Sequence, residues 1–254
     1  MSLHSAQRGR IGRYGVWQLR DYIVDRGLST ILIGFILGAQ FILPLRMGLH
    51  ETLGDLWATH PTGRRMLMVA VPQLVTTFAF LGTLIAVNGI VSNDRHHGYV
   101  RFLFAKPVSV VRYYLQAFAA SLVGLMAATA VLAGLFAVLV APLIPIEVIL
   151  IVLISAVGVG GIGFLLSTLV RGDWLFLSMV LAVSVLARGL YGQAGDWREQ
   201  LLVVLPPLHR LDDIRNPLLA GNAPVALDVA WVMGYGLACL LLGVVVLRRR
   251  PLAS

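Results

Sequence analysis

Charged residues are scarce in this sequence. They make up 13% of its 254 residues, whereas apolar residues make up 58%. An ordinary globular domain has roughly 25% charged residues, so a water-soluble fold is excluded for most of the chain. Cysteine is scarcer still, because Cys239 is the only one and lies inside an apolar run. An intramolecular disulfide is therefore impossible.

Lysine is equally rare, since Lys106 is the only one. A phosphate-binding P-loop needs a lysine between a glycine and a serine or threonine, but Lys106 lies between Ala105 and Pro107. The chain cannot by itself be a Walker-type ATPase. It also offers no paired carboxylates, no nucleophile with a base and no metal cluster at a plausible membrane depth. We therefore expect a protein that is not an enzyme and has no cofactor of its own.

Long apolar runs make up much of the sequence. Six of them have about the length that a helix needs to cross a bilayer, which is roughly 20 residues. We expect a single transmembrane domain over residues 1–254, in an all-α integral membrane protein with six transmembrane helices. The expected spans are about 28–45, 66–91, 113–141, 146–170, 174–192 and 227–247.

Basic residues are divided unevenly between the two sides that six spans define. Thirteen of the 20 lie on the side of the chain ends, and only four of the 12 acidic residues lie there. The positive-inside rule then places both termini in the cytoplasm, most simply at a bacterial inner membrane. The basic residues that give the chain its net charge of +8 flank the expected spans, where they set the topology. We therefore do not expect nucleic-acid binding.

Two segments outside the spans are expected to be helical. In residues 13–26, Val16, Leu19 and Ile23 recur at helical spacing with Trp17 beside them, which is typical of an amphipathic helix in the membrane interface. The alternative is that this segment continues the first span. The external segment 193–226 should form short helices, because prolines interrupt it at positions 206, 207, 217 and 224.

Glycines recur within two of the apolar runs. A dinucleotide-binding pattern is matched by Gly158, Gly160 and Gly163, but it lies in the middle of an apolar run rather than at a strand-to-helix turn. Small residues that let helices approach closely are the better interpretation. The same interpretation applies to Gly34 and Gly38, whose G-x-x-x-G spacing is also compatible with a dimer contact.

The connection between the second and third spans carries a longer pattern. Residues 91–112 begin with polar residues, have a glycine that allows a turn, and continue with the short amphipathic stretch 99–104 before a proline. This segment resembles the first cytoplasmic loop of type-2 ABC transporter permeases, the membrane subunits of ABC exporters. The positions that match the family pattern are Asp94, Gly98, Leu103, Pro107, Val108, Ser109 and Arg112.

The resemblance covers essentially the whole chain, although Asp94 replaces the usual glutamate and Gln116 a frequent lysine. It implies a permease that forms the translocation pathway as a dimer, with a homo- or heterodimeric second copy. It also implies a short coupling helix that docks on a separate cytoplasmic ATPase, which would bind ATP and Mg²⁺. The expected coupling residues are Asp94, Gly98, Tyr99, Arg101, Phe102, Leu103, Lys106, Pro107 and Arg112.

Membrane lipid is the other expected partner. The alternative function is an ATP-independent carrier, channel or assembly subunit of a larger membrane complex. A neighbouring gene for a P-loop ATPase would favour the exporter.

Overall fold

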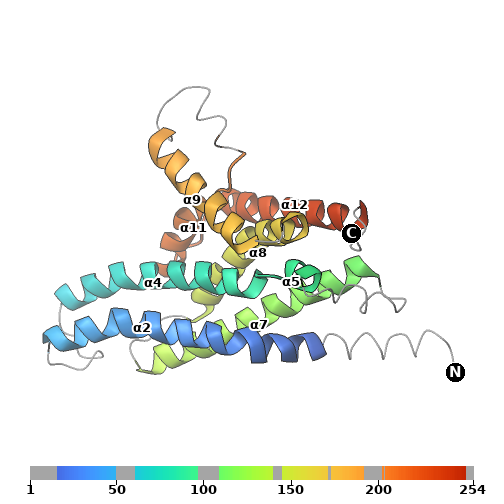
Figure 1. Cartoon of the computed structure of the whole chain (residues 1–254). Coiled ribbons are helices and arrows are strands. Elements are labelled where there is room, and N and C mark those ends of the chain that lie inside the picture. Colours follow the sequence, from blue (N-terminus) through green and yellow to red (C-terminus); the bar gives the residue numbers. More distant parts are fainter. Residues whose placement is uncertain are drawn as a thin grey trace.

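Helices account for all the regular secondary structure that is described in the chain (Figure 1). The structure is a computed structural model, and it describes residues 16–49, 61–96, 109–139, 145–170, 173–191, 202 and 204–249. The helices are η1 (Ile23–Gly27), α2 (Leu28–Leu49), α4 (Pro61–Val87), α5 (Ser92–His96), α7 (Val110–Leu139), α8 (Pro145–Leu169), α9 (Asp173–Tyr191), α11 (Arg210–Leu219) and α12 (Ala226–Arg249). The expected all-α fold is confirmed for this part of the chain.

Among the described residues, five helical stretches are long and apolar enough to cross a membrane. They are Val16–Ala39, Val71–Asp94, Val110–Val138, Ile146–Leu169 and Ala226–Arg249. The apolar part of α9, Leu175–Tyr191, is shorter than these. The chain is thus a multi-pass membrane protein by the length and composition of its helices. The expected span at 174–192 corresponds to α9, whose apolar part does not reach the length of the other five.

Helix α8 lies at the centre of the bundle, where α4, α7, α9 and α12 pack against it. Within its most apolar stretch 67% of the residues are buried, against 28% for α7 and for α12. A helix that is apolar all round is typical of such a central position. Phe164 of α8 is fully buried and meets Phe118 of α7 edge to face, with ring centroids 5.7 Å apart.

Glycines bring α8 and α12 into backbone contact. A Cβ at Gly236 of α12 would collide with the Val157 carbonyl oxygen and lie 2.7 Å from the Cα of Gly158. A Cβ at Gly161 would in turn collide with the Gly236 carbonyl oxygen. Only glycine on both helices permits this approach, which small residues commonly provide in membrane bundles.

The other glycines of the sequence pattern lie at different contacts. Gly158 faces Val232 of α12, whereas Gly160 and Gly163 both face Val87 at the end of α4. Gly34 of α2 lies against Leu132 of α7. A Cβ at Gly38 would meet nothing within 4 Å, so that position is open to the surroundings of the described chain.

The chain is helical from residue 16 through η1 and into α2 without a break. The described residues 16–26 therefore do not form a separate interfacial helix. They continue directly into the first long helix, which is the alternative considered for this segment. The physical reason is that no proline interrupts the segment and Gly27 is accommodated in a π-helical turn. Val16, Trp17 and Ile23 are exposed and Leu19 is half-buried, so the expected apolar residues face mainly outward.

The external segment is partly as expected. Helix α11 follows Pro206 and Pro207, and α12 begins soon after Pro224. The expected break at Pro217 is wrong, because α11 continues to Leu219. A proline this close to the end of a helix removes only one hydrogen bond from the last turn, and the helix ends soon after it.

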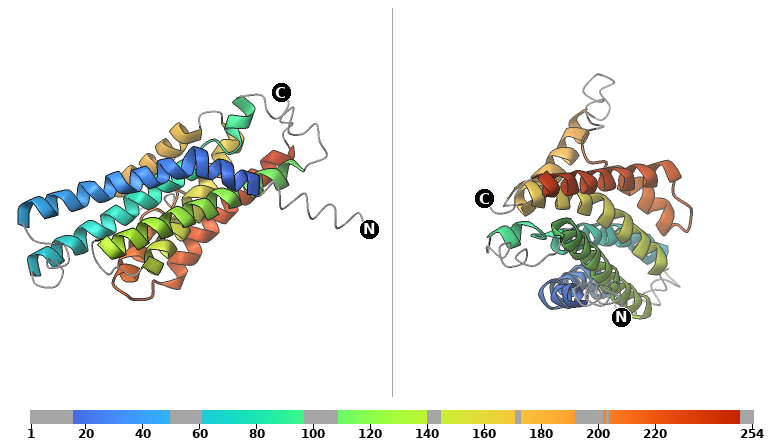
Figure 2. Two further views of the ribbon diagram at one scale, coloured as in Figure 1. Left: turned by 90° about the horizontal axis from the view of Figure 1, so that it is seen from below. Right: turned by 90° about the vertical axis from the view of Figure 1, so that its right-hand side faces the viewer.

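The first and last described residues lie at the same end of the bundle. The start of the helix at residue 16, α5, the start of α7 and the end of α12 all lie toward the right-hand end of the bundle in Figure 1, and the left view of Figure 2 agrees. Helix α11 lies toward the opposite end, and α9 leans away from the other helices there (Figure 1).

Candidate functional site

The expected coupling segment is described only at its two ends. Asp94 lies in α5, and Arg112 lies in the first turn of α7. Gly98, Tyr99, Arg101, Phe102, Leu103, Lys106 and Pro107 lie outside the described residues. The short helix expected at residues 99–104 therefore stays a prediction.

A tight turn connects α4 to α5 and positions Asp94. Gly89 adopts a φ of +69°, a backbone conformation that disfavours other residues. The amides of Val91 and Ser92 donate to Oγ of Ser167 at 2.9 and 3.3 Å. Because Ser167 is a buried residue of α8, the start of the coupling segment is fastened to the central helix. The Asn88-Gly89 dipeptide is a turn signal in the sequence, but nothing in the sequence points to Ser167.

The first helix is fastened to the same end of α4. Arg26 Nη1 donates to the Ala86 carbonyl oxygen at 2.8 Å, where the last carbonyls of α4 lack helical partners. Thr30 Oγ1 donates to the Arg26 carbonyl oxygen at 2.9 Å, just after the π-helical turn. Tyr22 is buried, and its ring fills the space that the missing side chain of Gly124 leaves on α7. Polar and small residues thus dock this helix.

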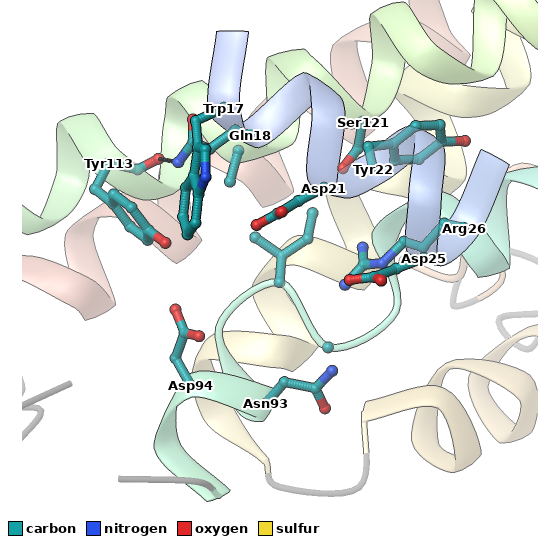
Figure 3. A pocket seen from close by; sticks show the side chains of 13 residues that line it. Trp17, Gln18, Asp21, Tyr22, Asp25, Arg26, Asn93, Asp94, Tyr113 and Ser121 are labelled. Atoms are coloured by element: carbon teal, nitrogen blue, oxygen red, sulfur yellow. Dashed lines mark hydrogen bonds between the residues drawn. The ribbon is translucent and has the colours of Figure 1, made fainter. Parts of the chain in front are cut away.

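A cavity of about 520 Å³ lies between the first helix, the α4–α5 turn and α7 (Figure 3). Asp21, Asp25 and Asp94 line it, with the Arg26 guanidinium as the only cationic side chain among the lining residues. The other lining residues are Trp17, Gln18, Tyr22, Gly89, Ile90, Asn93, Tyr113, Ala117 and Ser121. Sequence reasoning singled out Asp94 and Trp17 but could not place them beside the other two carboxylates.

A second, more open groove lies at the same end, between α7 and α12. It has a volume of about 570 Å³, and Arg112 and Arg248 line it together with Ser109 and Gln116. Two guanidinium groups from different helices suit an anionic group. The two hollows at this end therefore have opposite charge character.

At the opposite end of the bundle, ion pairs of α11 hold the helices together. Arg210 Nη1 lies 2.7 Å from Asp228 Oδ1, and its guanidinium lies 5.3 Å from the centroid of the Trp231 ring. Arg215 binds Asp212 at 3.0 Å and donates to Thr76 Oγ1. Since these contacts join α11 to α12 and α4, they have a structural role.

His209, next to these ion pairs, provides a test by pH. Burial lowers the pKa of His209 below the usual 6.5, and the positive charges of Arg188 and Arg210 lower it further. The unfolded chain therefore takes up a proton near pH 6.5 while the folded chain resists it, so folding stability falls as the pH drops through this window. We expect the melting temperature to fall more for the wild type than for His209→Gln when the pH goes from about 8 to about 5.5. Identical slopes would contradict the lowered pKa.

Among the described residues, no group of three or more His, Cys, Asp and Glu side chains lies close enough together to hold a metal ion. The described residues form a multi-pass helical membrane protein, and the two hollows described above lie at the end of the bundle where the helix at residue 16 starts. Comparison with known proteins adds no relative, because no family model, no curated protein and no solved structure matches the chain.

Proposed function

We propose that the chain is the membrane-spanning permease subunit of an ATP-driven ABC exporter. The observation that carries the proposal is the segment from Asp94 to Arg112, whose sequence pattern resembles the ATPase-docking loop of type-2 permeases. Its described ends support such a loop. Asp94 and Tyr113, the neighbour of Arg112, line one cavity with the first helix, so the two described ends of the segment lie at one place in the bundle.

In this proposal α9 is the fifth span along the chain, and it brings the number of spans to six. Its 19 residues extend about 28 Å at 1.5 Å per residue, close to the roughly 30 Å of the hydrocarbon core. Six spans would put both chain ends on one side, in keeping with the first and last described helical ends lying at the same end of the bundle (Figures 1 and 2). The excess of basic residues there makes that side the cytoplasm, at a bacterial inner membrane.

The energy would come from a separate nucleotide-binding subunit that binds ATP and Mg²⁺. The sequence supports this division because its only lysine is not part of a P-loop. Closure of the ATPase subunits would move the helices of two permease copies, which together form the pathway.

Purification of the tagged chain from its native host in mild detergent tests the proposal. A Walker-type ATPase is expected to co-purify, and the complex is expected to hydrolyse ATP. Recovery of the intact chain without such an ATPase, under conditions that preserve other membrane complexes, would contradict the proposal.

Arg101→Glu makes the test specific for the coupling segment. A reversed charge at a docking surface meets like charge in the partner, and transport-coupled ATP hydrolysis is expected to fall about tenfold while membrane insertion is unchanged. Arg249→Glu is the matched control, since Arg249 ends α12 at the same end of the bundle. Equal hydrolysis in both variants would remove the segment from the coupling mechanism.

A further inference from the structure

Most of the charged side chains that line the cavity beside the first helix are negative, although the helix ends around it carry positive ones. It lies at the end of the bundle that holds the start of the first helix, the start of α7 and the end of α12 (Figure 1). These helix ends carry Arg20, Arg112, Arg248 and Arg249. Three of the four acidic residues on that side of the sequence nevertheless line the cavity, namely Asp21, Asp25 and Asp94. Asp21 and Asp25 form no ion pair within the described part of the chain. Such a concentration of carboxylates attracts a cation.

One buried polar atom of a lining residue, Gln18 Oε1, independently indicates a ligand. Gln18 is only 8% exposed, and its Oε1 has no hydrogen-bond partner, although its Nε2 donates to the Tyr113 carbonyl oxygen at 3.4 Å. A buried acceptor without a donor costs roughly 1–3 kcal/mol. An amide oxygen can only accept, so the missing group at Gln18 must carry N–H or O–H.

The geometry favours an organic cation over a metal ion. The three carboxylates do not form a group that could hold a metal ion, since none exists among the described residues. Trp17 and Tyr113 instead bring aromatic rings to the side of Asp21 (Figure 3). Aromatic faces attract ammonium and guanidinium groups but add little for a hydrated metal ion. Ile90 and Ala117 supply an apolar part of the wall.

We propose that this cavity binds the ammonium group of an amphiphilic amine. Asp21 and Asp25 balance its charge, Trp17 and Tyr113 flank it, Gln18 Oε1 accepts one of its N–H groups, and the apolar wall receives its carbon chain. A volume of about 520 Å³ lies within the usual range for sites of small organic ligands. The amine is either the headgroup of an ethanolamine phospholipid or a soluble amine. The site does not depend on ATP-driven transport, and its failure would leave the proposed function untouched.

Titration calorimetry of the purified chain in neutral detergent tests the site. The probes are 2-phenylethylamine, which is cationic at neutral pH, and its N-acetyl derivative, which is neutral; empty micelles serve as the blank. The amine is expected to bind at least about tenfold more tightly than the neutral derivative, because only the cation meets the carboxylates and the aromatic faces. Equal binding of the two probes to the wild type would overturn the proposal, with no variant needed.

Variants locate the binding. Asp21→Asn with Asp25→Asn is expected to weaken amine binding about tenfold, because both charges are lost while the size of the side chains is kept. Asp213→Asn is the matched control, since Asp213 is exposed on α11 at the far end of the bundle. Unchanged amine affinity in the double variant would overturn the proposal.

Nanodiscs distinguish the two sources of the amine. If the natural occupant is the lipid headgroup, adding phosphatidylethanolamine to phosphatidylcholine discs lowers the apparent affinity of the wild type for 2-phenylethylamine by competition. If the occupant is a soluble amine, the affinity is the same in both kinds of disc. Either result supports the ammonium site, provided that the double variant binds the probe weakly in both.

Discussion

Gly236→Ala is expected to destabilise the folded chain by about 3 kcal/mol or more. The added methyl would collide with the Val157 carbonyl oxygen of α8, and there is no flexible side chain to move aside. Relief requires that α8 and α12 separate, which disrupts the packing between the central helix and its neighbour. The expected result is a large fall in melting temperature in detergent, with most of the protein aggregated on size-exclusion chromatography.

Gly234→Ala is the matched control for this prediction. Gly234 lies on the same helix two residues earlier, and a Cβ there would meet nothing within 4 Å. Because alanine is the better helix former by roughly 1 kcal/mol, Gly234→Ala should leave the melting temperature unchanged or raise it. If both variants behaved alike, close backbone packing of α8 and α12 would be contradicted.

Gly89→Ala is expected to cost about 2 kcal/mol of stability and to weaken amine binding in the adjacent cavity. The φ of +69° is unfavourable for alanine, and the new Cβ would lie 2.5 to 2.7 Å from the side-chain atoms of Asn93. Asn93 lines the cavity with Asp94, so its displacement changes the lining. The measurements are thermal unfolding and calorimetry with 2-phenylethylamine.

The control for Gly89→Ala is Gly221→Ala. Gly221 has a φ of +76° between α11 and α12, but a Cβ there would meet nothing within 4 Å. Both variants share the backbone strain, and only Gly89→Ala adds the contact with Asn93. An equal loss of stability, together with unchanged amine affinity in both, would mean that Asn93 is not constrained by the turn.

The helices could be predicted because hydrocarbon thickness fixes the length of an apolar run. The expected spans at 66–91 and 146–170 each overlap one observed helix, although α4 ends at Val87, where Asn88 and Gly89 begin the turn. The first helix was predicted less well. Its apolar spacing indicated an interfacial helix, but spacing cannot tell whether a chain bends away from the next span or continues into it.

The cavity could not be found from the sequence. Asp94 is separated from Asp21 and Asp25 by the whole of α2 and α4, and only the docking of the first helix onto the α4–α5 turn brings it beside them. That docking depends on Arg26 reaching the Ala86 carbonyl oxygen through a π-helical turn. A single extra residue in a helical turn changes which side chains share a face of the helix. The spacing of apolar residues in the sequence does not predict such a π-helical turn.

The Ser167 hydroxyl has a mechanical consequence. It holds the amides of Val91 and Ser92 just before Asp94, and it is part of α8, whose 25 residues extend about 37 Å to Pro145 at the opposite end. A force applied to the chain as it leaves α5 would therefore act on a stiff rod through the middle of the bundle. The backbone contact with α12 would make two helices tilt as one lever rather than slide past each other.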